Sequence, residues 1–332
     1  MSNLAVIGGG SWGTALAIIL APRFSRVRFW VFEKDLAAHM TSSRENDVYL
    51  PGVQLPANVE IHSDLAACLD QADIVLSVMP SHVARAVYQQ MLPHLAPSMA
   101  FVSATKGLEN GTLLRISEVI TEVVCAKFQP RIAVISGPTF AREVARGEPT
   151  ALVVASADPS LAEMVQSSFS GSTFRLYTSS DPAGVEVGGA VKNVVAIGAG
   201  VCHGLGLGSN ALAALITRGL AEISRLAIAM GGKPATLAGL AGLGDLVLTC
   251  TGDLSRNRKV GMELAAGKKL DEIVSSMQMV AEGIKTTNAT VDLAHRHQVE
   301  MPIAEQMHAM LHQGRAPREA IRRLMERSLK PE

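Results

Sequence analysis

The N-terminal residues combine a short apolar run, a glycine-rich turn and the start of a helix. Residues 4–7 read LAVI, residues 8–13 read GGGSWG, and a helix-favouring run follows. In this pattern Gly8 makes the tight turn, Gly10 lets the backbone approach a pyrophosphate, and Gly13 permits close packing of helix against sheet. The N-terminus of the helix then presents unpaired N–H groups to phosphates. The pattern predicts a β-α-β unit that binds a dinucleotide.

The same alternation of strand and helix patterns continues to about residue 180. The expected strands are nearly continuous in apolar residues, as strands covered on both faces require, and they lie at Leu4–Ile7, Val27–Phe32, Ile74–Met79, Ala100–Ser103, Ile132–Ile135, Leu152–Val154 and Phe174–Tyr177. The helical patterns lie at Thr14–Leu20, His82–Leu92 and Leu113–Lys127, and a further helix begins near Pro159, between the last two expected strands. Repeated β-α-β units predict an α/β fold with a Rossmann-type, parallel, doubly wound sheet.

After the turn-forming residues 179–182 (SSDP) the strand patterns stop and helical patterns continue to the C-terminus. The chain has 332 residues, which is enough for two domains. We therefore expect a Rossmann-like domain at 1–180 and an all-α domain at 181–332. The stretch between Lys192 and Arg218 has no charged residue. Glycines at 204, 206 and 208 interrupt it, so two buried helices are expected rather than a membrane span.

Composition and charge exclude several classes of protein. Lys and Arg number 30, Asp and Glu also 30, and the net charge of zero argues against nucleic-acid binding. The 4 cysteines are widely spaced, and His295 and His297 point to different faces of a helix, so no metal site is expected. The start of the chain lacks the pattern of a signal peptide. A reducing compartment is therefore expected, and secretion is not.

The end of the second expected strand bears on the choice of cofactor. Glu33 lies at the position where an acid binds the 2′-hydroxyl of the ribose in NAD, whereas the adjacent Lys34 suits the 2′-phosphate of NADP. Lys34 is equally compatible with an ordinary solvated loop. The residues therefore leave NAD(H) and NADP(H) both open.

Three later segments gather polar side chains among small residues: 103–109 (SATKGLE), 136–141 (SGPTFA) and 255–259 (SRNRK). The first two follow expected strands and should emerge at the carboxyl edge of the sheet, where such folds bind ligands. Lys106 and Thr139 are therefore candidates for contact with cofactor and substrate. A solvated loop residue is the alternative for Lys106.

Lys192 interrupts an apolar helix pattern, so its ammonium is expected to be partly desolvated, which favours the neutral form that accepts a proton. A buried structural ion pair is the alternative. Asp245, in an uncharged run, is a candidate partner, or else a helix N-cap. Ser255 is expected to cap a helix over 256–266, whose N-terminus, with Arg256 and Asn257, suits a small phosphate dianion.

Taken together, these segments resemble the bacterial type of NAD(P)-dependent glycerol-3-phosphate dehydrogenase over essentially the whole chain. The matching motifs are 8–15 (GGGSWGTA), 80–82 (PSH), 103–109, 136–141, 192–193 (KN), 242–246 (GLGDL) and 255–257. The resemblance implies interconversion of sn-glycerol 3-phosphate and dihydroxyacetone phosphate, a cytoplasmic homodimer, and supply of glycerol 3-phosphate to phospholipid synthesis.

The resemblance also implies roles for individual residues. Cofactor contacts fall on the glycine loop and on Ser11, Trp12, Lys34, Lys106, Ala141, Arg256, Val280 and Glu282. Substrate contacts fall on Lys106, Gly137, Thr139, Lys192, Asn193, Asp245, Ser255, Arg256 and Asn257, with Thr249 near the reacting carbon. Lys192 is implied to be the proton acceptor, assisted by Lys106 and Asp245. Family members often carry Arg or His where this chain has Phe32, which weakens the expectation of NADPH.

Three alternatives remain at this stage. Two are other two-domain dehydrogenases, acting on 3-hydroxy acids or on 6-phosphogluconate, and the third is a module that senses the cofactor without turnover. The motifs at 136–139 and 255–257 favour glycerol 3-phosphate over the other substrates. The presence of Lys106, Lys192 and Asp245 favours an enzyme over a binding module.

Overall fold

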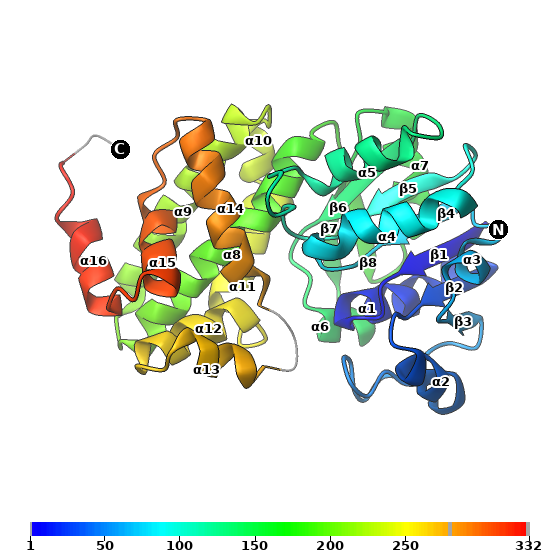
Figure 1. Cartoon of the computed structure of the whole chain (residues 1–332), viewed down its shortest axis with the longest axis horizontal. Coiled ribbons are helices and arrows are strands. Elements are labelled where there is room, and N and C mark those ends of the chain that lie inside the picture. The colour runs from blue at the N-terminus through cyan, green and yellow to red at the C-terminus, as the bar shows by residue number, and fades with distance from the viewer. Residues whose placement is uncertain (1, 278–280, 330–332) are drawn as a thin grey trace. The chain divides into compact units, whose positions relative to one another are not determined.

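The computed structural model of the chain describes residues 2–277 and 281–329. The chain divides into two compact units. Unit 1 comprises residues 1–109 and 114–186, and unit 2 comprises residues 110–113 and 187–332. Figure 1 shows the strands gathered in unit 1, whereas the labelled elements of unit 2 are helices.

Unit 1 is built on one eight-stranded sheet of order β3-β2-β1-β4-β5-β6-β7-β8. The strands are β1 (Asn3–Ile7), β2 (Arg26–Trp30), β3 (Val59–His62), β4 (Ile74–Ser77), β5 (Ala100–Ser103), β6 (Arg131–Ser136), β7 (Thr150–Ala155) and β8 (Phe174–Ser179). The first six run parallel in the order 3-2-1-4-5-6 of the Rossmann fold. The expected α/β fold with a Rossmann-type sheet and a helical C-terminal region is confirmed.

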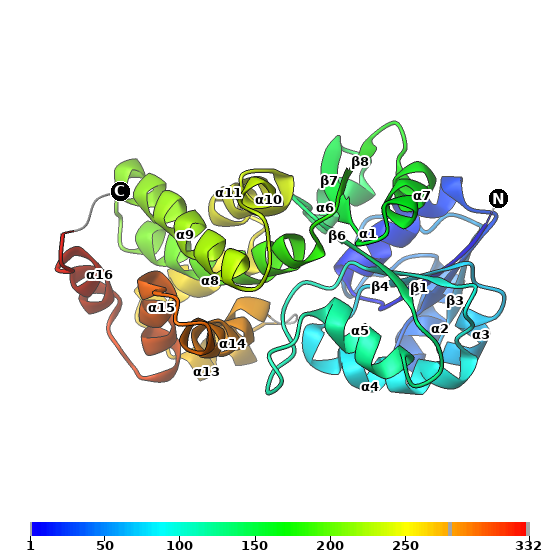
Figure 2. The same ribbon diagram turned by 90° about the horizontal axis from the view of Figure 1, so that it is seen from above.

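Helices cover both faces of the sheet, as Figure 2 shows from above. They are α1 (Ser11–Leu20), α2 (Lys34–Ser43), α3 (Leu65–Leu69), α4 (Ala84–Met91), α5 (Ile116–Val124), α6 (Ala141–Ala145) and α7 (Pro159–Phe169), with short 3-10 turns η1 (Ala21–Arg23), η2 (Ser81–Val83) and η3 (Leu92–His94). Leu4 and Val6 belong to the core under α1 and α7, whereas Ala5 and Ile7 belong to the core under α4 and α5. Alternate residues of β1 thus fill two separate cores, which explains the unbroken apolar run.

Two features of the sheet differ from the expectation. The strand β3 is absent from the expected set because Val59–His62 (VEIH) alternates in polarity at the sheet edge and has no apolar run. The pair β6 and β7 is antiparallel, whereas the repeated β-α-β pattern predicts a parallel sheet. Residues 137–149 contain only the short helix α6. The chain therefore does not cross to the other end of the sheet, and β7 starts at the edge where β6 ends. This return keeps the Ser136–Ala141 segment at the carboxyl edge of β6.

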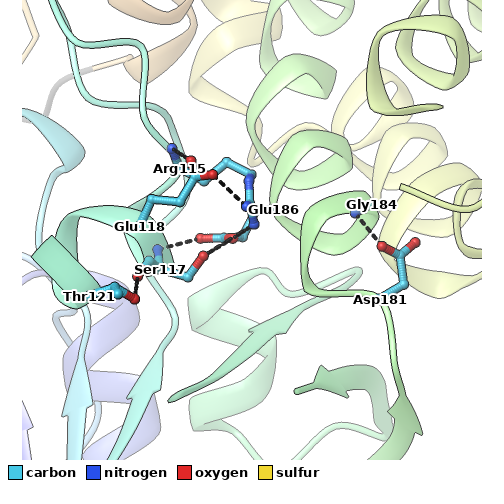
Figure 3. A network of polar contacts seen from close by, with 7 residues as sticks. All are labelled: Arg115, Ser117, Glu118, Thr121, Asp181, Gly184 and Glu186. Atoms are coloured by element: carbon cyan, nitrogen blue, oxygen red, sulfur yellow. Dashed lines mark hydrogen bonds and ion pairs between the residues drawn. The ribbon is translucent and has the colours of Figure 1, made fainter. Parts of the chain in front are cut away.

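The N-terminus of α5 is capped from two sides (Figure 3). Glu118 accepts a hydrogen bond from the backbone N–H of Arg115 at 2.9 Å. Glu186, at the end of unit 1, accepts from Ser117 N at 2.8 Å and Ser117 Oγ at 2.6 Å, and it pairs with Arg115. Burial raises the pKa of Glu186. These acceptors satisfy N–H groups that the first turn of a helix leaves without partners.

The regular elements in the described part of unit 2 are all helices. Its elements are α8 (Pro182–Gly204, whose first turn is counted with unit 1), α9 (Ser209–Ala229), α10 (Pro234–Leu237), η4 (Leu240–Gly244), α11 (Asp245–Thr251), α12 (Arg256–Ala265), α13 (Leu270–Ser275), α14 (Glu282–Arg296), α15 (Pro302–His312) and α16 (Pro317–Met325). The predicted pair of helices joined by a glycine turn corresponds to α8 and α9. Among the described residues, α8 is long and apolar enough to cross a membrane, but its most apolar stretch of 18 residues is 100% buried inside the protein.

Close approach of backbones fixes α12 against α8. A Cβ placed on Gly200 would lie 1.9 Å from Arg258 O, and one on Gly261 would lie 1.9 Å from Ile197 O. Only glycine at both positions lets the two helices come this near, since any side chain would force them apart. The first half of α12 is thereby placed beside residues 197–200 of α8.

Glu222 of α9 caps α15 from outside that helix. Its carboxylate is 3% exposed and accepts hydrogen bonds from Ile303 N at 2.8 Å and Ala304 N at 3.3 Å. Burial raises the pKa of Glu222 to about 7, although the two N–H donors favour its charged form. The folded state therefore holds this proton at pH values where the unfolded chain has lost it.

This assignment predicts a pH-dependent stability. Because the folded pKa lies above the unfolded value, stability decreases as pH rises from about 4.5 to about 7, by on the order of 2 kcal/mol. Glu222→Gln is neutral at every pH and should show a flatter profile of unfolding free energy between pH 5 and 8 in urea titrations. Glu163→Gln, at an exposed position of α7, is the control. Parallel profiles for wild type and Glu222→Gln would contradict the prediction.

Candidate active site

The loop between β1 and α1 is shaped by the absence of side chains. Gly8 has φ +130°, and a Cβ there would lie 2.5 Å from Val78 O. A Cβ on Gly13 would lie 1.9 Å from Gly8 O, so the helix packs directly on the loop. At Gly10, by contrast, an added Cβ would have no atom of the described residues within 4 Å apart from those of Gly10 and its two chain neighbours. The loop thus has a closed inner side and an open outer side at Gly10.

The open side coincides with the start of α1. Gly10 is the N-cap, and no side chain caps the helix. The N–H groups of Ser11, Trp12 and Gly13 have no acceptor within the helix, because such groups lack partners in the first turn. Ser11 and Trp12 are both partly exposed. This combination of open space and unpaired donors fits the pyrophosphate of a dinucleotide.

Asn46 supports this loop from behind, and sequence patterns do not identify it. The side chain is fully buried, and its Nδ2 donates to Gly9 O at 2.8 Å and to Thr14 Oγ1 at 2.8 Å. Thr14 Oγ1 in turn donates to Gly10 O at 2.9 Å. These bonds fix carbonyls of the loop, so the free N–H groups keep their direction. A single buried amide in an irregular segment produces no periodic signal.

Lys106 and the Ser136–Ala141 segment meet at the carboxyl edge of β5 and β6. Lys106 Nζ donates to Gly137 O at 3.1 Å and to Thr139 Oγ1 at 3.2 Å. Gly137 has φ +154°, and a Cβ there would lie 2.8 Å from Leu152 Cβ. Ala141 begins α6 and, like Trp12, packs against the core beneath α1. The structure therefore brings these residues of unit 1 together.

Lys192 lies in α8 with its side chain almost completely enclosed. It is 4% exposed, and its Nζ forms an ion pair with the carboxylate of Asp245, which is 0% exposed. Nζ also donates to Thr249 Oγ1 at 3.0 Å, and that hydroxyl donates to Asp245 O at 2.6 Å. The expected pairing of Lys192 with Asp245 is present. Both the proton-transfer role and the purely structural role are compatible with this geometry.

Asp245 is not the N-cap that the alternative interpretation required. It is the first residue of α11, and Gly244 occupies the cap. A π-helical turn, Leu240–Gly244, leads directly into it, with Gly244 N donating to Gly239 O at 3.1 Å. π-turns add one residue to a helical turn and recur at functional sites. Here the turn sets the direction in which the carboxylate leaves the helix.

The buried thiol of Cys250 is the neighbour of Thr249 in sequence. Burial raises the pKa of Cys250 to about 12. The thiol is therefore protonated at neutral pH and takes no part as a nucleophile.

Asn193 lies one residue after Lys192 and joins a second polar cluster in unit 2. Asn257 Nδ2 donates to Asn193 Oδ1 at 3.0 Å, and Gly283 N donates to Asn257 Oδ1 at 3.0 Å. The Asn257 amide thus connects α8, α12 and the start of α14. Glu282 begins α14 and is partly exposed. Val280, predicted as a cofactor contact, lies outside the described residues.

The N-terminus of α12 carries the third predicted segment. Ser255 is its N-cap, with Oγ accepting from Arg258 N at 3.2 Å, as expected. Arg256 is the first helical residue and is exposed. One helix end therefore offers a guanidinium and unpaired N–H groups side by side, a combination suited to a phosphate dianion.

The predicted residues form two groups, one in each unit. The group in unit 1 lies at the carboxyl edge of the sheet and comprises the glycine loop, Lys106 and the Ser136–Ala141 segment. The group in unit 2 lies around α8 and comprises the predicted residues from Lys192 to Asn257.

Lys34, a predicted cofactor contact, is the first residue of α2 and is exposed. Within residues 2–277 and 281–329, no three His, Cys, Asp or Glu side chains are grouped in a way that could hold a metal ion.

Comparison with known families resolves the identity of the chain. A profile described as "NAD-dependent glycerol-3-phosphate dehydrogenase N-terminus" matches residues 3–162, and the corresponding C-terminus profile matches residues 181–322. The chain belongs to the NAD-dependent glycerol-3-phosphate dehydrogenase family. It is therefore an oxidoreductase that uses NAD(P)(H), as the sequence predicts.

Individual members of the glycerol-3-phosphate dehydrogenase family agree over the full length. A protein of Koribacter versatilis named glycerol-3-phosphate dehydrogenase (NAD(P)+) is 58% identical over 329 residues, which cover 98% of each chain. One of Syntrophotalea carbinolica with the same name is 53% identical over 99% of each chain. The crystal structure of glycerol-3-phosphate dehydrogenase from Coxiella burnetii has a TM-score of 0.94 at 41% identity, covering 98% of this chain and 99% of that one.

These matches support the glycerol-3-phosphate dehydrogenase interpretation and give no support to the alternatives, namely the other dehydrogenase types and the non-catalytic module.

The contacts of Asn46 generate a prediction for cofactor binding by this dehydrogenase. Asn46→Ala leaves Gly9 O and Thr14 Oγ1 without their donor, so NAD(P)H affinity should fall about tenfold or more, and stability by about 2 kcal/mol. Calorimetric titration with NADH and NADPH, alongside urea unfolding, measures both effects.

The matched control is Asn58→Ala. Asn58 also donates to two carbonyls, Ala21 O at 2.8 Å and Phe24 O at 3.2 Å, but beyond the far end of α1. It should lose stability while keeping its cofactor affinity. Equal cofactor affinities for the Asn46→Ala and wild-type proteins would show that Asn46 does not order the loop.

Proposed function

We propose that the protein interconverts sn-glycerol 3-phosphate and dihydroxyacetone phosphate, with Lys192 as the residue that exchanges a proton with the substrate oxygen. The observation that carries this role is the enclosed ammonium of Lys192, held by Asp245 and Thr249. A lysine in this setting has a fixed direction and little access to bulk water. Both properties are needed for general acid and base catalysis.

Each part of the chain is assigned one main role, although a few residues of each part are also assigned to the other ligand. We propose that residues 1–180 form the cofactor domain and that residues 181–332 form the substrate domain. The glycine loop, Ser11 and Trp12 would hold the pyrophosphate, and Ala141, Val280 and Glu282 would supply further cofactor contacts. When bound, the nicotinamide supplies the hydride in reduction and accepts it in oxidation.

The proton moves at the Nζ atom of Lys192. In ketone reduction the ammonium donates its proton to the oxygen on which negative charge develops. In alcohol oxidation neutral Nζ accepts the hydroxyl proton. Asp245 keeps the charged form stable, and Thr249 fixes the direction of the remaining N–H bonds. Lys106, with Thr139 and Gly137, would orient the substrate hydroxyl and carbonyl groups.

The phosphate of the substrate is assigned to the start of α12. The N–H groups of its first turn offer hydrogen bonds, and the exposed Arg256 offers a positive charge. The Ser255 cap fixes the backbone at the start of this helix. Asn257 is hydrogen-bonded to Asn193 and Gly283, so its main role would be to hold the start of α12 in place against α8. Binding energy from the remote phosphate orients the carbonyl near Lys192.

The setting in the cell follows from the family resemblance. We propose a cytoplasmic homodimer that acts on a small phosphorylated substrate and supplies glycerol 3-phosphate for glycerophospholipid synthesis. Light scattering on the purified protein measures the oligomeric state.

Replacing Lys192 tests the catalytic assignment. Lys192→Ala should lower kcat for dihydroxyacetone phosphate reduction by about 10²–10⁴-fold, because the proton donor is lost. Titration should show unchanged NADH and NADPH affinity, and added methylamine should restore part of the rate. Lys259→Ala, an exposed lysine of α12, is the control. Near-full turnover in Lys192→Ala with normal cofactor binding would refute the role.

Arg256 is tested by comparing two substrates. Arg256→Ala should raise KM for dihydroxyacetone phosphate by about 10-fold or more, since a charge-assisted contact to phosphate is removed. The low activity with unphosphorylated dihydroxyacetone should not change. The Lys259→Ala protein controls for the loss of one positive charge on the same helix. Equal losses with both substrates would show that Arg256 does not bind the phosphate.

A further inference from the structure

The segment after β2 lies beside the glycine loop. Gly8 N donates to Trp30 O at 3.2 Å, and a Cβ on Gly9 would lie 2.9 Å from Val31 Cγ1. Glu33 follows Val31 by two residues and is exposed. In a fold of this type, the acid at this point faces the adenosine ribose of the dinucleotide. Glu33 is therefore placed where the two cofactors differ, at the 2′ position.

Tyr49 holds the Glu33 carboxylate. Its Oη donates to Glu33 Oε1 at 2.9 Å. Burial, and then the hydrogen bond and charge of Glu33, raise the pKa of Tyr49, so the phenol remains a donor. Within the described part of the chain, no donor forms a hydrogen bond with Glu33 Oε2. One oxygen is thus fixed by the protein and the other is available to a ligand hydroxyl.

The backbone of Tyr49 is fixed by the residue that fixes the glycine loop. Tyr49 N donates to Asn46 Oδ1 at 3.1 Å, and Leu50 N donates to Asn46 O at 2.8 Å. Asn46 Nδ2 donates to Gly9 O. The pyrophosphate loop and the Tyr49–Glu33 pair are therefore parts of one hydrogen-bonded arrangement.

Two cations of α2 and its C-cap, His39 and Arg44, have partners other than Glu33. Arg44 donates to the carbonyls of Pro56 and, at 2.9 Å, Val59. His39 lies 3.3 Å from the Asp47 carboxylate. Phe32 is 73% exposed and carries no charge, which leaves Lys34 as the nearby cation in sequence. A 2′-phosphate would thus meet a fixed carboxylate and one solvated lysine.

We propose that Glu33, held by Tyr49, selects a dinucleotide with a free 2′-hydroxyl, so that this chain binds NAD(H) in preference to NADP(H). The carboxylate accepts a hydrogen bond from the ribose hydroxyl and repels a phosphate at the same place. The inference rests on the proposed function for the class of cofactor. It adds the residues that choose between the two members of that class.

Direct binding tests the selection without turnover. Calorimetric titration of the wild-type chain should give an affinity for NADH at least tenfold higher than for NADPH. Glu33→Gln and Tyr49→Phe should each weaken NADH binding by about 3- to 30-fold and leave NADPH binding equal or stronger. Asp35→Asn removes an exposed carboxylate two residues away and should leave both affinities unchanged.

A reversal experiment provides the complementary test. The double variant Phe32→Arg with Glu33→Ser adds a cation and removes the repelling charge, so NADPH affinity should rise at least tenfold. Steady-state reduction of dihydroxyacetone phosphate with each cofactor should follow the same order as binding.

The outcomes separate this inference from the proposed function. Wild-type preference for NADPH, or equal affinities, would overturn the inference, as would an equal shift in Asp35→Asn and Glu33→Gln. Wild-type NADH binding in the Tyr49→Phe protein would overturn the role of Tyr49. Selective NADH binding without any reduction of dihydroxyacetone phosphate would refute the proposed function and leave the inference standing.

Discussion

A positive charge enclosed in an all-helical unit is the constraint around which that unit is organised. An ammonium removed from water must be paired and hydrogen-bonded, and leaving it unpaired costs about 3–5 kcal/mol. Lys192 meets this requirement through Asp245 and Thr249, which come from a different helix. The packing of α8 against α11 is therefore coupled to the state of one proton-carrying group. A displacement of either helix would affect stability and, in the proposed mechanism, proton transfer at Lys192 together.

The glycine loop of unit 1 is suited to bind an anion through backbone N–H groups alone. The glycine loop provides backbone N–H groups and excludes side chains on its inner side. Its precision depends on carbonyls behind the loop, which Asn46 fixes. The direction of the outward-facing N–H groups therefore depends on the hydrogen bonds that the inward-facing loop carbonyls accept. Most of this site is backbone, so a few well-supported side chains are sufficient.

The sequence was informative where physical requirements repeat along it. Apolar runs located seven strands, because residues buried on both faces must all be apolar, and the glycine spacing located the loop of unit 1. The strand Val59–His62 was not predicted, because a strand at the edge of a sheet does not require a continuous apolar run. Lys192 and Asp245 stood out as charges in apolar surroundings, and their contact was expected. Asn46 and Tyr49 could not be found, because their partners depend on how an irregular segment folds back on the loop.

The π-helical turn at Leu240–Gly244 has a consequence for how this gene can vary. The turn holds one residue more than an α-helical turn, and Asp245 follows it immediately. Losing that residue would restore a regular helix and rotate every later side chain by about 100°. The carboxylate would then leave α11 on another side, away from the lysine. Substitutions within the turn should shift the Asp245 carboxylate by small amounts. The loss of a single codon, by contrast, should remove its contact with Lys192 altogether.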